Sequence, residues 1–201
     1  ISLDTLDPAK YARITRVGRL EQALAGLEAA LSAGFEKVKI NCVLIGGFND
    51  DEIPALADLT RMYPVDMRFI ELMPMSGNQE FGPEAFIPCS CVLERLPELE
   101  AGSRHDGVAQ LYKLSGARGN VGLISPVSAH FCGECNRLRL TADGHLKPCL
   151  HSAEEYALKG LDFAGMRRQI QTAILAKPAM HRPLSVRSRS LTGRAMNRIG
   201  G

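Results

Sequence analysis

The sequence lacks three features that would place it in a specialised class of protein. No apolar run approaches the roughly 20 residues needed to cross a bilayer, so we expect no membrane-spanning helix. No stretch reads as a secretory signal peptide. The net charge of +2 is too small to indicate a nucleic-acid coat, and the positive excess falls late in the chain. We therefore expect a cytoplasmic protein that binds neither membranes nor nucleic acid.

Disulfide bonds are not expected either. The six cysteines include a C-x2-C pair and follow no secretory signal, which favours thiols kept reduced in the cytosol. The remaining composition, 45% hydrophobic and 23% charged over 201 residues, is that of a soluble globular protein with one core or a core and a small appended unit. Because the chain starts at Ile1 with what reads as the end of a strand, we expect a piece of a longer protein.

The first 74 residues alternate between helical and strand patterns. Asp7 as a cap and Pro8 at the first position predict a helix over 8–14, and Gly34 is placed to end a second amphipathic helix. The predicted helices are 8–14, 19–33 and 49–62, the last capped by Asn49, and the predicted strands are 35–44 and 65–72. Such alternation with short connections is typical of an α/β protein with a parallel sheet that wraps towards a barrel.

Beyond Pro74 the pattern changes. A loop over 75–86 and a short helix over 91–99 are followed by two strands, 107–114 and 120–126, which we expect to form an antiparallel unit. A helix over 163–177 is stopped by Pro178, and the remainder is basic and without period. The predicted domains are 1–74, 75–180 and a tail over 181–201.

Three cysteines, Cys132, Cys135 and Cys149, have metal-ligand spacing. The first two form a C-x2-C turn, and Cys149 returns after a hairpin whose two-residue turn is Asp143-Gly144. With His151 the set would suit tetrahedral zinc, whereas three cysteines alone suit an iron–sulfur cluster with one open iron. Spacing leaves both alternatives open.

Two arginines stand next to these cysteines. Arg137 and Arg139 would share one face of the predicted strand, because side chains two residues apart point the same way. Paired guanidinium groups suit phosphate, since each can donate two parallel hydrogen bonds. A solvated strand face is the alternative reading.

Residues 131–150, FCGECNRLRLTADGHLKPCL, resemble the C-terminal cluster motif of the GTP 3′,8-cyclase family of molybdenum cofactor biosynthesis, which are radical S-adenosylmethionine (SAM) enzymes. The segments ISLDTLD, VKINCVLIGGFNDDE, MRFIELMP and the terminal IGG resemble the same family in the same order. The resemblance implies the C-terminal part of an incomplete (β/α) radical SAM barrel. It also implies a small antiparallel α+β unit that carries a [4Fe–4S] cluster.

The resemblance also assigns site residues. It implies cluster ligation by Cys132, Cys135 and Cys149. It implies contacts to GTP from Lys39, Arg137, Leu138 and Arg139. It implies contacts to SAM from Ser2 and Met73. It also implies that Arg68, Gly200 and Gly201 are needed for the chemistry.

One family motif is missing from these residues. No three cysteines reproduce the C-x3-C-x2-C motif that binds the radical-generating [4Fe–4S] cluster, so we expect the chain alone not to turn over. Intact, such an enzyme would take hydrogen from the GTP ribose C3′ and join that carbon to C8 of guanine, giving (8S)-3′,8-cyclo-7,8-dihydroguanosine 5′-triphosphate. The resemblance further implies a possible homodimer and coupling to cyclic pyranopterin monophosphate synthase. The alternatives are a zinc-binding structural module and another radical SAM enzyme with an auxiliary cluster.

Overall fold

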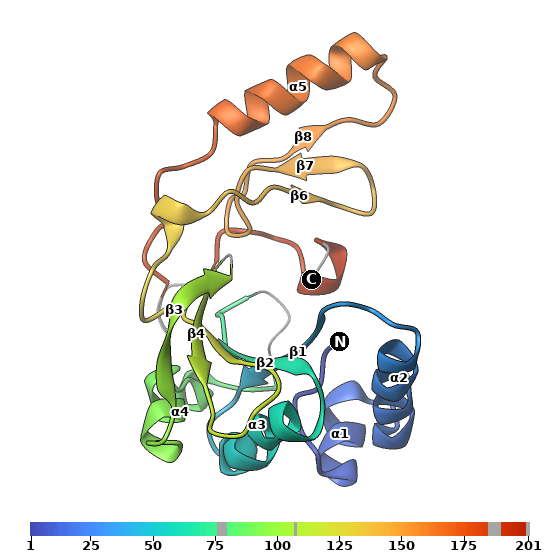
Figure 1. Ribbon diagram of the computed structural model, residues 1–201. Coiled ribbons are helices and arrows are strands. Elements are labelled where there is room, and N and C mark those ends of the chain that lie inside the picture. Colours follow the sequence, from blue (N-terminus) through green and yellow to red (C-terminus); the bar gives the residue numbers. More distant parts are fainter. Residues whose placement is uncertain (76–79, 107, 185–189, 200–201) are drawn as a thin grey trace. The chain divides into compact units, whose positions relative to one another are not determined.

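The computed structural model describes residues 1–75, 80–106, 108–184 and 190–199 (Figure 1). The chain forms two compact units. The first contains residues 1–72 and 84–129, and the second contains residues 73–83 and 130–201. Across the described ranges, no helix is both long and apolar enough to cross a membrane.

A five-stranded mixed sheet forms the centre of the first unit, in the order β1-β2-β5-β4-β3. Its strands are β1 Val38–Leu44, β2 Val65–Glu71, β3 Glu100–Asp106, β4 Ala109–Lys113 and β5 Val121–Ile124. The pairs β1–β2 and β2–β5 are parallel, whereas β4 runs antiparallel to both β5 and β3. The helices are α1 Pro8–Thr15, α2 Leu20–Ser32, α3 Ile53–Met62 and α4 Ser90–Arg95.

The sheet and its helices share one hydrophobic core. Strand β1 alternates, with Ile40, Cys42 and Leu44 fully buried and the intervening residues half-buried. Strand β2 is buried at all but one position, as expected for a central parallel strand. The α/β class is therefore confirmed, while closure towards a barrel stays a prediction.

Local capping is confirmed at α1 and differs at the third predicted helix. The Asp7 side chain accepts a hydrogen bond from the Lys10 amide at 2.8 Å, with Pro8 at the first helical position. The segment predicted to begin at Asn49 instead starts with a 3-10 turn, Asp50–Glu52, before α3. The Asn49 side chain does not cap it, because that side chain is buried and bonded elsewhere.

The strands predicted at 107–114 and 120–126 are present as β4 and β5, but they do not start a separate unit. Strand β5 lies parallel to β2, so residues 84–129 belong to the same sheet as the first 72 residues. The boundary expected near residue 74 therefore differs from the observed division. Strand β3 was not predicted, and α4 ends at Arg95 because Pro97 disfavours helical conformation at the residue before it.

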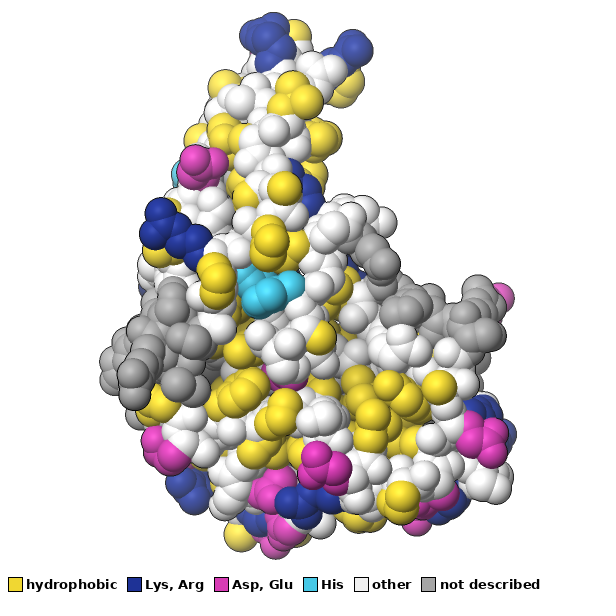
Figure 2. All heavy atoms as spheres, turned by 90° about the vertical axis from the view of Figure 1, so that its left-hand side faces the viewer, with side chains coloured by type: hydrophobic (Ala, Val, Ile, Leu, Met, Phe, Trp, Pro, Cys, Tyr) yellow, Lys and Arg dark blue, Asp and Glu magenta, His cyan; other side chains and the backbone are white. Residues whose placement is uncertain are grey.

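The second unit contains a three-stranded antiparallel sheet in the order β6-β7-β8, and α5 packs against β7 and β8 (Figure 1). Its elements are β6 Arg139–Leu140, β7 His145–Lys147, β8 Tyr156–Ala157, α5 Phe163–Leu175 and the 3-10 turns Cys132–Glu134 and Met196–Arg198. Hydrophobic side chains are exposed in the upper part of Figure 2, where α5 lies, and Ala173 is the buried residue of that helix.

The predicted hairpin before Cys149 is confirmed, although its turn is longer than expected. The Thr141 amide donates to the His145 carbonyl at 2.8 Å, which leaves a three-residue loop, 142–144, in place of the two-residue turn. Gly144 has φ +85°, the left-handed conformation that three-residue loops require at this position. The hairpin thus pairs the strand that follows Cys135 with the strand that leads to Cys149.

Candidate functional site

The three predicted metal ligands lie on two neighbouring segments of the second unit. Cys132 begins the 3-10 turn Cys132–Glu134, and the Cys135 amide donates to the Cys132 carbonyl at 3.1 Å. Cys149 follows β7 after Pro148. All three are half-buried, and within the described residues no cysteine is in a disulfide.

Lys177 connects the two cysteine-bearing segments, and Arg139 lies on the first of them. Burial and the neighbouring Arg137 lower the pKa of Arg139, while the thiols of Cys135 and Cys149 act in the opposite direction. Arg139 lies four residues after Cys135 and pairs with Lys147, two residues before Cys149, across β6 and β7. The Lys177 Nζ lies 3.6 Å from Cys135 Sγ and donates to the Pro148 carbonyl at 3.2 Å.

Iron–sulfur clusters are bound by cysteine thiolates, so three free cysteines with cations nearby are suitable ligands for one. A [4Fe–4S] cluster bound by Cys132, Cys135 and Cys149 would leave one iron open. Among the residues that the structure describes, no three His, Cys, Asp or Glu side chains are grouped so as to hold a metal ion. The assignment of these cysteines to a cluster therefore stays a prediction.

The two arginines are adjacent, but not for the reason that the sequence suggested. Strand β6 begins at Arg139, so Arg137 and Leu138 precede it and the shared strand face is not formed; that part of the argument is wrong. The two residues are separated by Leu138 alone, and burial and then the charge of Arg137 lower the pKa of Arg139. Arg137 is exposed, whereas Arg139 is half-buried and donates to the Ile199 carbonyl at 3.4 Å. Two neighbouring cations with one fork open to solvent can bind phosphate.

His151, the fourth ligand of the zinc alternative, already has polar and ring contacts. Its Nδ1 lies 3.0 Å from Ser190 Oγ, and its ring meets His181 edge-on at 4.7 Å between centroids. His181 in turn meets His130 at 4.8 Å, and Figure 2 shows a group of histidine side chains at the surface. Burial, then His181, Arg139 and His130, lower the pKa of His151 to about 4. A zinc site would have to use the other nitrogen, Nε2, of this neutral ring.

Three predicted site residues lie in the first unit. Ser2 pairs with Asn41, Asn41 with Arg68, and Arg68 with Gly122, so they form one row across the parallel strands. Arg68 is 6% exposed, and Lys39 lies two residues before Asn41 on the same face of β1. The structure thus brings Ser2 and Arg68 into one row, a juxtaposition that no local pattern predicted.

The remaining predicted residues lie elsewhere. Met73 begins the second unit, where its carbonyl accepts the Met75 amide at 2.8 Å. Gly200 and Gly201 lie outside the described residues. Cys89, a buried cysteine outside the predicted ligand set, donates its thiol to the Phe69 and Ile124 carbonyls, and burial raises the pKa of that thiol to about 12.

Sequence reasoning did not find Lys177. A lysine directly before the proline that ends a predicted helix was the available signal, because cations are favoured at helix C-termini. The histidine group and the Ser2–Asn41–Arg68 row were also missed, since each joins residues that are distant in the sequence.

Comparison with known proteins bears on both units. The family model described as Molybdenum Cofactor Synthesis C matches residues 65–183, and that of the Radical SAM superfamily matches residues 1–60. Over its whole length the chain is 43% identical to the GTP 3′,8-cyclase of Alkaliphilus oremlandii (strain OhILAs), of which it covers 64%. It is 46% identical to the GTP 3′,8-cyclase of Peptoclostridium acidaminophilum, of which it covers 62%.

The chain thus spans just under two thirds of the length of these relatives. The resemblance noted in the sequence extends over every residue of the chain and includes the segment with the three cysteines. Because the first family model covers more than half of its residues, this protein belongs to the Molybdenum Cofactor Synthesis C family.

Proposed function

We propose that this chain is the GTP-binding part of a GTP 3′,8-cyclase in molybdenum cofactor biosynthesis. The observation that carries the proposal is the set of contacts that joins Arg137 to the cysteine-bearing segments. The Lys177 Nζ donates to the carbonyls of Arg137 and of Pro148, the residue before Cys149, and lies 3.6 Å from Cys135 Sγ. Two arginines that closely follow the C-x2-C turn can bind a phosphate, and the cysteines can bind a metal cluster. GTP is a ligand with both kinds of group.

The proposed cofactors are SAM and [4Fe–4S] clusters. When bound, SAM would supply the hydrogen-abstraction chemistry, and a cluster held by Cys132, Cys135 and Cys149 would supply a metal site for the purine. The residues of this chain would bind and orient the nucleotide, so that C3′ of the ribose and C8 of guanine lie within reach of each other. A second [4Fe–4S] cluster would be bound by cysteines other than the six of this chain.

The phosphate end is assigned to the second unit. Arg137 is exposed and can turn its fork to a phosphate, whereas Arg139 is half-buried and donates to the Ile199 carbonyl at 3.4 Å. Charge-assisted hydrogen bonds contribute about 1.5–3 kcal/mol each. We therefore expect Arg137 to contribute to affinity and Arg139 to fix the phosphates relative to the cysteines. Leu138, between them, is assigned to GTP by the resemblance alone.

The other assignments rest on the resemblance. Lys39 is proposed to contact GTP, and Ser2 and Met73 to contact SAM. Arg68 is proposed to act in the chemistry, as are the terminal glycines Gly200 and Gly201. A homodimer and functional coupling to cyclic pyranopterin monophosphate synthase, which would consume the product, also stay proposals.

The phosphate assignment is tested by isothermal titration of GTP into anaerobically purified protein. Arg137→Ala and Arg139→Ala are each expected to weaken GTP binding by about tenfold or more, because each removes at least one charge-assisted bond. Iron content should stay unchanged in both variants. Arg168→Ala, an exposed cation on α5, is the control and should bind as the wild type does. Unchanged affinity in both site variants would contradict the assignment.

The metal is tested by reconstitution with iron and sulfide in the presence of competing zinc. About four irons bound at these cysteines, with an electron paramagnetic resonance spectrum that GTP perturbs, are expected from the proposal. One zinc per chain and indifference to GTP would favour the zinc-binding structural module. Iron without any response to GTP would favour a radical SAM enzyme with another substrate.

A further inference from the structure

Lys177 makes three polar contacts, all in the second unit. Its Nζ donates to the Arg137 carbonyl at 2.8 Å and to the Pro148 carbonyl at 3.2 Å, and it lies 3.6 Å from Cys135 Sγ. An ammonium group has three N–H donors and no acceptor. These three contacts therefore account for all its donors, so the side chain is held at one place.

The backbone around Lys177 fixes where its side chain starts. The Lys177 amide donates to the Ile174 carbonyl at 3.1 Å, directly after the C-terminal cap Ala176 of α5. Pro178 follows and cannot continue the helix. The C-terminal end of a helix carries a partial negative charge, which favours a cation there. The backbone position of Lys177 is thus fixed by the end of α5, and its ammonium group reaches the cysteine site from there.

The contacts join two segments that each carry predicted ligands. Cys135 and Arg137 lie on the segment that leads into β6, whereas Pro148 directly precedes Cys149 after β7. Strands β6 and β7 are short, with the pairs Arg139–Lys147 and Leu140–Leu146. A cation that bonds to both segments beyond the strand pairs therefore restrains the separation of Cys135 and Cys149.

We propose that Lys177 is a positioning residue for the cysteine site, which holds the two ligand-bearing segments together and places a positive charge and an N–H donor at the Cys135 sulfur. The proposal rests on the proposed function, in which these cysteines bind a [4Fe–4S] cluster. Hydrogen bonds to the sulfurs and nearby charge set the reduction potential of such clusters. A cation stabilises the more negative, reduced state, so its removal lowers the potential.

The experiment compares the reconstituted wild-type protein with Lys177→Met by two measurements, loss of iron to a chelator and the reduction potential of the cluster. In the methionine variant we expect iron to be lost about tenfold faster, because the restraint on the two segments is gone. We expect the potential to fall by about 59 mV, which is a tenfold shift in a one-electron couple. A purely structural role for Lys177 would change the first measurement and leave the second unaltered.

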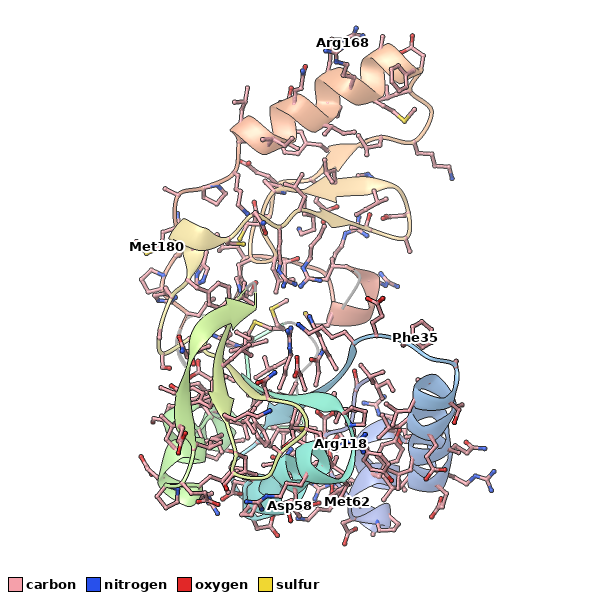
Figure 3. The ribbon with its side chains drawn as sticks, in the orientation of Figure 1. Phe35, Asp58, Met62, Arg118, Arg168 and Met180 are labelled. Atoms are coloured by element: carbon pink, nitrogen blue, oxygen red, sulfur yellow. The ribbon has the colours of Figure 1, made fainter. Side chains whose placement is uncertain are left out.

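Two further variants separate charge from packing. Lys177→Arg keeps the charge and should keep the potential near that of the wild type. Arg168→Met is the control, since Arg168 lies on the same helix and points away from the strands (Figure 3). Where the methionine variant does not fold, Lys177→Gln removes the charge and keeps a donor.

The outcomes distinguish this proposal from the function on which it rests. A wild-type potential in Lys177→Met, or in Lys177→Gln where that variant is used, overturns the role of Lys177 alone. The iron content of the wild-type protein is also compared with that of a Cys149→Ser variant. Equal iron contents would mean that no iron is bound at this site, and that result overturns both proposals.

Discussion

The side chain of Asn49 bonds to three backbone groups near the end of β1. It is fully buried, and its side-chain oxygen accepts the Ile45 amide at 2.8 Å. Its amide nitrogen donates to the Asp4 carbonyl at 2.7 Å and to the Val43 carbonyl at 2.9 Å. One side chain therefore satisfies backbone groups from three places around the end of β1.

We predict that Asn49→Ala destabilises the protein by about 3 kcal/mol or more, because each buried backbone group left without a partner costs about 1–3 kcal/mol. Urea denaturation followed by circular dichroism measures the change. Asn136→Ala, at an exposed position, is the control and should change stability by less than about 0.5 kcal/mol. A loss below about 1 kcal/mol at Asn49 would show that water replaces the lost bonds.

Asn49 and Asp7 also show which residue roles the sequence can reveal. Asp7 was predicted as a cap, and its partner, the Lys10 amide, is three residues away. The same reasoning assigned Asn49 to a helix start, but one of its partners, Asp4, is 45 residues away. Local patterns identify local hydrogen bonds, whereas the partners of a buried polar side chain are decided by which strands meet.

The same distinction holds for whole elements. The strands that became β4 and β5 were predicted from their alternation, and their antiparallel pairing is observed. The pairing of β5 with β2 was not predicted, because it joins segments about 50 residues apart and leaves no periodic signal. Gly119, just before β5, permits this pairing. A Cβ there would lie 1.7 Å from the Val65 carbonyl oxygen at the start of β2.

We predict that Gly119→Ala costs about 3 kcal/mol or more or prevents folding, because the clash is with backbone that is held in the sheet and cannot move aside. Thermal unfolding of the purified variant measures the loss. Gly26→Ala is the matched control: nothing lies within 4 Å of its new Cβ, and alanine in a helix is favoured over glycine by about 1 kcal/mol. Equal melting temperatures for Gly119→Ala and the wild type would mean that β5 can shift away from β2.

At the scale of the whole molecule, the sequence predicted the candidate metal ligands but not the distant residues whose contacts hold them in place. Cys132, Cys135 and Cys149 are visible because metal ligands recur at fixed spacings around a turn and a hairpin. Lys177 adjoins these cysteines only through the packing of α5. Arg139 was predicted, but its bond to the Ile199 carbonyl, 60 residues away, was not. The first unit repeats this pattern, since Ser2 and Arg68 share a row only because strands from distant segments pair.

In the basic C-terminal part of the chain, the described residues 190–199 are attached to the rest of the second unit by ion pairs of Arg194. The Arg194 guanidinium donates to both carboxylate oxygens of Glu155, at 2.7 and 2.6 Å, and to Asp143 at 3.0 Å. Lys147, fully buried, donates to the same Glu155 carboxylate at 3.1 Å. Arg194 and then Lys147 lower the pKa of Glu155, and Thr141 and then Arg194 lower the pKa of Asp143.

We predict that acid detaches residues 190–199. A carboxyl group whose pKa is lower in the folded state stabilises the fold above its unfolded pKa, about 4.3 for Glu, and this contribution is lost as the pH falls through the folded pKa. Hydrogen exchange of the 190–199 amides, corrected for intrinsic rates, should show protection at pH 7 that declines below about pH 4.

Two variants test whether the ion pairs of Arg194 cause this protection. In Arg194→Met the protection of these amides should be low already at pH 7 and should change little with pH. Arg198→Met, exposed in the same segment, should behave as the wild type. Full protection of Arg194→Met at pH 7 would mean instead that the buried side chains of Thr192 and Ile199 hold the segment without the ion pairs.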